Sequence, residues 1–138
     1  MASILVMEDN AQAGLEISEM LRAAEYEVEW CQNATDAKAA ITERRFDLLV
    51  VDLYVHKDGH PVSDGGLSVI GWIRASNPHR GIATAFDVPI VAISGAGSTP
   101  GNPYALVTAE AVGANASLAK PLDRERFLAT VSEHLGAA

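Results

Sequence analysis

Apolar residues fall in five short runs along the chain, and a stretch with helical spacing follows each run. The runs at 4–7, 46–52 and 88–93 are nearly continuous, which is typical of strands buried on both faces. Residues 26–31 alternate apolar with polar side chains, as a strand does at the edge of a sheet. A fifth, shorter strand is predicted at 116–119. Strands that alternate with helices predict a parallel sheet with helices on both faces.

Five helices are expected after these strands. Their apolar faces are, in chain order, Ile17, Met20, Leu21 and Ala24; Ala37, Ala40 and Ile41; Leu67, Ile70 and Ile73; Ala105, Ala109 and Val112; and Phe127, Leu128, Val131 and Leu135. Asn33 or Thr35 can cap the second helix, Gly113 suits the end of the fourth, and the last begins near Asp123. The most apolar strands belong in the middle of the sheet, so the strand order 2-1-3-4-5 fits. The predicted fold class is α/β, a doubly wound five-stranded parallel sheet.

Two segments follow neither pattern. Residues 54–66 are predicted as a long polar loop, and residues 95–102, which are rich in Gly, Ser and Pro, as a mobile loop. A metal site built from His56, Asp58 and His60 is disfavoured against a solvated loop, because no further ligand is placed nearby. Long loops in compact domains are usually functional or disordered, and these two flank the ends of central strands.

Composition limits the class of protein. The 138 residues make one domain, 1–138, with no repeats and no room for an output domain. No apolar run is long enough to cross a bilayer and no signal peptide is evident, so a cytoplasmic protein without membrane association is expected. The net charge of -8 argues against nucleic-acid binding, and the single cysteine, Cys31, excludes an internal disulfide.

Chemically useful side chains follow four of the five predicted strands. Glu8 and Asp9 follow the first strand, Asp52 ends the third, Ser94 follows the fourth and Lys120 the fifth. The carboxyl ends of parallel strands meet in one crevice near the topological switch point, here between strands one and three. Each residue taken alone could be a helix cap or a turn residue. Together they predict a single shallow site.

The charges in this site indicate a divalent cation. Two like charges about 4 Å apart at an effective dielectric of about 20 repel by roughly 4 kcal/mol, so three clustered carboxylates need a partner. Oxygen ligands that share a site with phosphate suit Mg²⁺. Asp52 can act as a nucleophile through an acyl phosphate, while Lys120 and Ser94 can bind phosphoryl oxygens. The sequence therefore predicts phosphoryl transfer.

The chain resembles the receiver domain of two-component response regulators over essentially its whole length. The segments that carry the resemblance are ILVMEDN at 4–10, FDLLVVD at 46–52, GGL at 65–67, ISG at 93–95, and Gly113-Ala114 through Lys120-Pro121. The resemblance implies a flavodoxin-like fold and makes Asp52 the phosphoacceptor. Glu8 and Asp9 would hold Mg²⁺ with Asp52 and the main-chain carbonyl of Tyr54. Ser94 and Lys120 would contact the phosphoryl group, and a cis bond would precede Pro121.

The same resemblance implies partners and a role. The phosphoryl donor would be a histidine kinase or a phosphotransfer protein, and a downstream protein of unknown identity would recognise the chain's own surface, with or without a homodimer. The protein would act as a stand-alone switch or phosphorelay intermediate. It would not be an enzyme beyond catalysing its own phosphorylation and dephosphorylation.

Departures from the family pattern concern the readout of phosphorylation. Ser117 stands three residues before the lysine, where the family often has an aromatic side chain that swings inward. Tyr104 is a candidate substitute, although packing is the simpler interpretation of that residue. The segments 54–66 and 95–102 are longer than usual.

Three alternatives compete with an active receiver. A degenerate receiver would serve only as a protein-binding module. A phosphatase with an Asp-x-Asp motif would lack its general acid, because Tyr54 stands at that position. A flavin-binding protein is disfavoured, because the acidic turn at 8–10 would repel a flavin phosphate.

Overall fold

The computed structural model describes residues 1–53, 55–57, 60–62, 64–76, 81–95, 109–110 and 112–136, with 55–57, 60–62 and 64 described by their backbone only. Five parallel strands form the main sheet in the order β2-β1-β3-β6-β7. They are β1 (Ser3–Met7), β2 (Glu27–Cys31), β3 (Leu48–Asp52), β6 (Ile90–Ser94) and β7 (Ala116–Ala119). The predicted strand order 2-1-3-4-5 is confirmed, with the alternating strand β2 at an edge.

Four helices have defined bounds in the described part of the chain. They are α1 (Ala11–Ala23), α2 (Ala34–Glu43), α3 (Asp64–Arg74) and α5 (Arg124–Leu135). Of the fourth expected helix only 109, 110 and 112 are described, and these three are helical. Gly113 then takes a φ of 138°, and its N–H donates to the carbonyls of Ala109 and Glu110, as expected of a residue that ends a helix.

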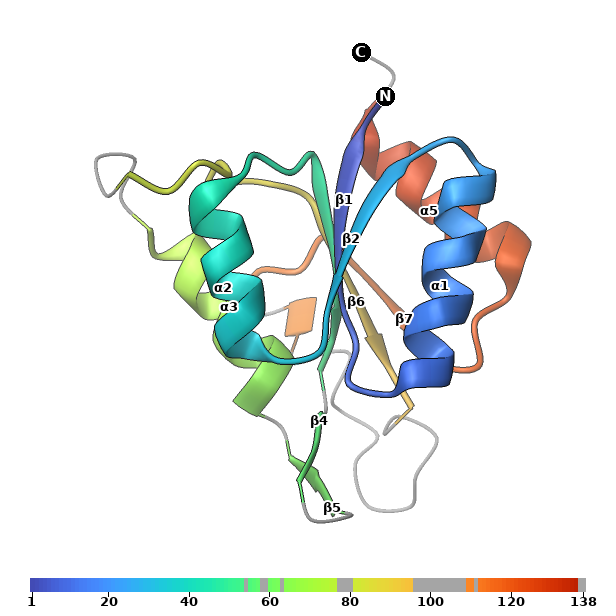
Figure 1. Ribbon diagram of the computed structural model, residues 1–138, viewed down its shortest axis with the longest axis horizontal. Helices are drawn as coiled ribbons and strands as arrows, with labels where there is room; N and C mark the ends of the chain where they lie inside the picture. The colour runs from blue at the N-terminus through green and yellow to red at the C-terminus, as the bar shows by residue number, and fades with distance from the viewer. Residues whose placement is uncertain are drawn as a thin grey trace.

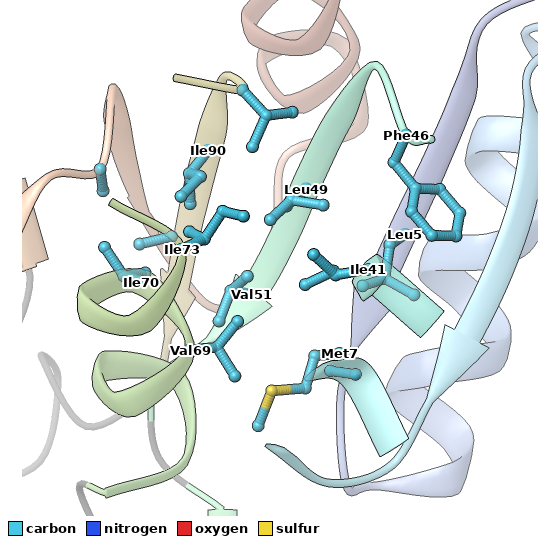
Figure 2. Close-up of a cluster of buried hydrophobic side chains, with 14 of the residues drawn as sticks. Leu5, Met7, Ile41, Phe46, Leu49, Val51, Val69, Ile70, Ile73 and Ile90 are labelled. Atoms are coloured by element: carbon cyan, nitrogen blue, oxygen red, sulfur yellow. The ribbon is translucent and has the colours of Figure 1, made fainter. Parts of the chain in front are cut away.

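Helices cover both faces of the sheet (Figure 1). Each face has its own cluster of buried side chains. On one face α1 and α5 bury Ile17, Leu21, Phe127 and Val131 against strand residues that include Ile4 and Val50. On the other face α2 and α3 pack against β1, β3 and β6. The side chains labelled in Figure 2 are Leu5, Met7, Ile41, Phe46, Leu49, Val51, Val69, Ile70, Ile73 and Ile90. Successive residues of the central strands therefore enter opposite cores, which explains their continuous apolar sequence.

Short polar residues cap the start of α1, α2 and α5. The side chain of Asn10 accepts a hydrogen bond from the N–H of Ala13, that of Asn33 from Asp36, and that of Asp123 from Glu125. Asn33, rather than Thr35, is therefore the cap of α2. None of the helices in the described ranges is long and apolar enough to cross a membrane.

The segment predicted as one polar loop after Asp52 contains a β-hairpin. Strands β4 (Val55–Lys57) and β5 (His60–Val62) pair antiparallel and form a second, two-stranded sheet. The hairpin extends beyond the carboxyl edge of the main sheet (Figure 1). The prediction of a loop was wrong for these six residues, which form paired strands. The sequence signal that was missed is the Asp-Gly dipeptide at 58–59, which favours a hairpin. The loop expected at 95–102 lies outside the described residues, apart from Gly95.

Candidate functional site

The strand ends bring the predicted site residues to one edge of the sheet. Glu8 directly follows β1, Asp52 is the last residue of β3, Ser94 is the last of β6, and Lys120 directly follows β7. The strand register aligns these ends, since Asp52 pairs with Ile93 and Ser94 pairs with Ala119. Parallel pairing in register therefore produces the convergence that the sequence predicts.

Three carboxylates form the centre of the site. Glu8, Asp9 and Asp52 each offer one oxygen, and these oxygens all lie within 4.8 Å of one another. The side chain of Glu8 is fully buried, that of Asp52 is 2% exposed, and Asp9 is half-buried. Burial of carboxylates at such spacing is unfavourable unless cations offset their charge.

Lys120 supplies one such cation. Its Nζ contacts Oε1 of Glu8 and lies 3.2 Å from Oδ2 of Asp52. Its backbone N–H donates to the carbonyl of Ser94 at 3.0 Å, and the bond between Lys120 and Pro121 is cis, as the family resemblance implies. One ammonium group is therefore shared by two buried carboxylates and is too little to offset three ionised carboxylates.

The protonation equilibria of the site reflect this imbalance. Burial and then the neighbouring carboxylate of Glu8 raise the pKa of Asp52 from 3.8 to about 8, although Lys120 acts in the opposite direction. Burial lowers the pKa of Lys120, but its contacts with Glu8 and Asp52 outweigh burial and the net shift is upward. In the ion-free protein, Lys120 therefore stays charged at neutral pH while Asp52 tends to hold a proton.

The donor set fits Mg²⁺. Three carboxylate oxygens within 4.8 Å of one another are hard oxygen ligands with an excess of negative charge. Neither Cys nor His belongs to this group of described residues, so the group offers softer transition metals none of their preferred ligands.

Local structure fixes the acidic turn between β1 and α1. The N-cap of α1 is Asn10, so neither Glu8 nor Asp9 caps the helix. The backbone N–H of Asn10 donates to Oε2 of Glu8 at 3.2 Å, and the N–H of Glu8 donates to the carbonyl of Cys31 at 2.9 Å. The helix-cap interpretation of the two acids is therefore wrong, and both carboxylates face the site.

Two glycines, which sequence reasoning passed over or quoted only within a family motif, allow close packing around the site. A Cβ on Gly66, in the first turn of α3, would lie 2.3 Å from the carbonyl oxygen of Asp52 and 2.7 Å from Cα of Leu53. A Cβ on Gly14 of α1 would lie 2.2 Å from the indole ring of Trp30. For Gly14 the sequence signal is an isolated glycine inside a helical pattern, which usually has a packing reason.

The remaining predicted residues lie around this centre. Ser94 is fully buried at the end of β6. The main-chain carbonyl of Tyr54, expected as a further ligand, lies outside the described residues, and so does Tyr104. Ser117 is half-buried, and its hydroxyl donates to Oε2 of Glu110 at 2.7 Å. The position where the family often has an aromatic side chain is therefore occupied by a polar contact between β7 and residue 110.

Known proteins share this sequence pattern and fold. The chain matches the response regulator receiver domain family over residues 4–132. The polar-differentiation response regulator DivK of Brucella anthropi is 26% identical over 136 residues, which cover 99% of this chain and 98% of DivK.

Solved structures of receiver domains have the same fold as this chain. The receiver domain of the sensor histidine kinase PA1611 from Pseudomonas aeruginosa PAO1 is 26% identical with a TM-score of 0.76, and the match covers 99% of this chain and 98% of that one. Its crystal structure has a magnesium ion coordinated in the active-site cleft. NtrX from Brucella abortus is 26% identical with a TM-score of 0.77, but the match covers 97% of this chain and only 27% of NtrX. This chain thus spans about a quarter of NtrX.

The family match covers all five strands of the main sheet and the acidic residues at their ends. The 2-1-3-4-5 parallel order and the cluster of Glu8, Asp9 and Asp52 agree with that match. The chain belongs to the response regulator receiver domain family and is a signalling domain of two-component systems.

Proposed function

We propose that this receiver domain accepts a phosphoryl group on Asp52 from a phosphohistidine of a histidine kinase or phosphotransfer protein. The observation that carries the proposal is the cluster of Glu8, Asp9 and Asp52 oxygens within 4.8 Å, with Nζ of Lys120 3.2 Å from Asp52. A buried carboxylate beside two further acids and one shared ammonium suits phosphoryl transfer, which depends on positioning and charge neutralisation.

The reaction forms one bond and breaks one. An oxygen of Asp52 attacks phosphorus, the phosphorus–nitrogen bond of the donor histidine breaks, and an acyl phosphate forms on Asp52. The released imidazole takes a proton from solvent. Glu8, Asp9 and Asp52 would hold Mg²⁺, with the carbonyl of Tyr54 as a further ligand. When bound, the ion neutralises the negative charge that gathers on the phosphoryl oxygens.

Two further residues are assigned to the phosphoryl group. Lys120 lies within hydrogen-bonding distance of Asp52, so its ammonium can pair with a phosphoryl oxygen after transfer. Ser94 ends β6 beside this position, and its hydroxyl can donate to another phosphoryl oxygen. Loss of the phosphoryl group by attack of water on phosphorus restores the carboxylate, so the domain would catalyse its own dephosphorylation.

We also propose that the chain acts as a stand-alone receiver that signals through its own surface to a downstream protein. The full-length match to DivK supports this role, because 98% of DivK is covered. Size-exclusion chromatography with and without acetyl phosphate then tests whether phosphorylation produces a homodimer. A degenerate receiver has less support, because the oxygens of Glu8, Asp9 and Asp52 lie within 4.8 Å of one another and Lys120 pairs with Glu8 and Asp52.

Phosphorylation of the purified chain tests the proposed function. Incubation with acetyl phosphate and Mg²⁺ should add one acid-labile phosphoryl group, measured as a mass increase of the intact protein. Asp52→Asn removes the nucleophile and should abolish the increase, and EDTA should do the same to the wild type. Equal labelling of wild type and Asp52→Asn would exclude Asp52 as the acceptor.

A further inference from the structure

The indole of Trp30 contacts the backbone of the acidic turn. Its Nε1 donates to the carbonyl oxygen of Glu8 at 2.8 Å. Trp30 lies in the edge strand β2 and pairs in register with Val6, while the next residue, Cys31, accepts the hydrogen bond from the N–H of Glu8. Both backbone groups of Glu8 are thus held from β2, one by a main-chain group and one by a side chain.

The carbonyl that Trp30 holds belongs to the peptide group between Glu8 and Asp9. A peptide group is planar, so a fixed carbonyl direction fixes the whole plane that joins the two acids. The chain leaves the sheet at this point, since β1 ends at Met7 and α1 begins at Ala11. A side-chain donor therefore holds the peptide plane between the two acids where strand pairing no longer does.

Gly14 allows the indole to reach this carbonyl. The ring lies directly against the backbone of α1, and a Cβ on residue 14 would approach ring atoms Cε2 and Cζ2 at 2.2 Å and Nε1 at 2.5 Å. The same ring edge that carries the donor nitrogen is thus in contact with the helix. A larger residue at position 14 would move the ring and its N–H together.

We infer that Trp30, seated against Gly14, is a positioning residue for the Mg²⁺ site. It touches neither the ion nor the phosphoryl group, and it acts by fixing the peptide plane between Glu8 and Asp9. This inference rests on the proposed function of the acidic cluster, and it adds Trp30 to the residues that the Mg²⁺ site requires. Residues that orient ligands influence metal affinity nearly as much as some ligands do.

The test compares Mg²⁺ affinity in three variants. Trp30→Phe keeps an aromatic ring but removes the donor, and Gly14→Ala keeps the donor but displaces the ring. Trp72→Phe is the matched control, because Trp72 lies in α3 under the ammonium of Lys38, on the other face of the sheet. Isothermal titration calorimetry on each folded variant gives the Kd for Mg²⁺, and melting in EDTA reports stability separately.

Loss of one neutral hydrogen bond should raise the Kd for Mg²⁺ about 3- to 10-fold in Trp30→Phe and Gly14→Ala. Trp72→Phe should leave it within about twofold of wild type. The rate of labelling by acetyl phosphate should approach the wild-type rate at saturating Mg²⁺, because the ligands themselves are intact. A purely structural role would lower stability without this shift in Mg²⁺ dependence.

A spectroscopic measurement follows the hydrogen bond itself. In ¹⁵N-labelled protein the indole N–H signal of Trp30 should shift during Mg²⁺ titration with a midpoint equal to the Kd, and that of Trp72 should not. An unmoved Trp30 signal, or an equal Kd in Trp30→Phe and Trp72→Phe, would overturn the role of Trp30 while leaving Asp52 phosphorylation intact. A wild-type protein that binds no Mg²⁺ would overturn both.

Discussion

The shared ammonium of Lys120 dominates the site at the scale of single residues. It contacts Glu8 and lies 3.2 Å from Asp52, and it is only 24% exposed. Removing one partner of a buried ionic group is costly, because the remaining charges keep their desolvation penalty without the compensating attraction. In the ion-free state Lys120 therefore stabilises the arrangement that the acidic cluster needs.

Lys120→Met should weaken the ion-free protein and increase its dependence on Mg²⁺. The two carboxylates would lose their cation, so the free energy of unfolding in EDTA should fall by about 3 kcal/mol, the low end for a buried pair, since Lys120 is partly exposed. Added Mg²⁺ should then raise the melting temperature more than it does in wild type. Lys38→Met is the control, since Lys38 bonds Ser68 on α3 rather than a site residue. An equal Mg²⁺ response in Lys120→Met and wild type would contradict the ion-pairing role.

At the scale of elements, the N-terminus of α3 rests on the strand that carries Asp52. Gly66 permits this contact, because the backbone of Asp52 and Leu53 occupies the space that a side chain at position 66 would need. The helix end can therefore approach the phosphoacceptor strand more closely than any other residue at 66 would allow. The position of α3 and the conformation of residues 52–53 are consequently coupled.

Gly66→Ala and Gly71→Ala should have opposite effects. At Gly66 a Cβ would lie 2.3 Å from a carbonyl oxygen, so the helix must shift and the free energy of unfolding should fall by about 1–3 kcal/mol. At Gly71, in the same helix, the nearest atom is Cγ1 of Val112 at 3.8 Å, and alanine should stabilise by about 0.5–1 kcal/mol. Urea denaturation measures both. A neutral Gly66→Ala would show that the contact is easily relieved.

Ser117 links β7 to residue 110 through a side-chain hydrogen bond. The family often has an aromatic side chain at this position, but this sequence has Ser117, and its hydroxyl donates a hydrogen bond to Glu110. A short polar side chain cannot swing between a core position and solvent as a ring does. Burial of a ring at position 117 is therefore not available to this chain.

At the scale of the whole molecule, the acidic cluster links stability to pH. The unfolded chain releases the Asp52 proton near pH 4, whereas the folded, ion-free protein keeps it until about pH 8. The stabilising contribution of the protonated group is therefore complete below pH 4 and is lost as pH rises toward 8. This trend is opposite to that of a carboxylate whose pKa is depressed by a salt bridge.

Melting in EDTA at several pH values tests this linkage. Asp52→Asn cannot ionise, so its melting temperature should exceed that of wild type by an increasing margin between pH 5 and pH 8.5. The margin should reach several degrees, as expected for a few kcal/mol in a domain of about this size. Saturating Mg²⁺ should reduce it, because a bound cation relieves the same repulsion. Parallel curves for the two proteins would contradict a raised pKa for Asp52.

Sequence alone determined the five strands of the main sheet, their order and the set of residues at the strand ends, but not the hairpin of β4 and β5. Continuous apolar runs mark 4–7 and 46–52 as buried strands because such strands have no polar face, and the alternating run at 26–31 belongs at an edge. The fold follows because these runs alternate with helical segments. Parallel strands then bring Glu8, Asp52, Ser94 and Lys120 to one edge, whatever the details of packing.

Only the tertiary structure decided how those residues are connected. One ammonium group pairs with both Glu8 and Asp52, and an indole from the edge strand holds the peptide group between Glu8 and Asp9. Gly14 and Gly66 leave space for close packing around the site. All of these contacts depend on distances between segments far apart in the chain. Periodicity reports which face of an element is buried, but not which atom lies against it. Contacts of a few ångströms are set by the joint packing of helices and sheet, and they are absent from any single stretch of sequence.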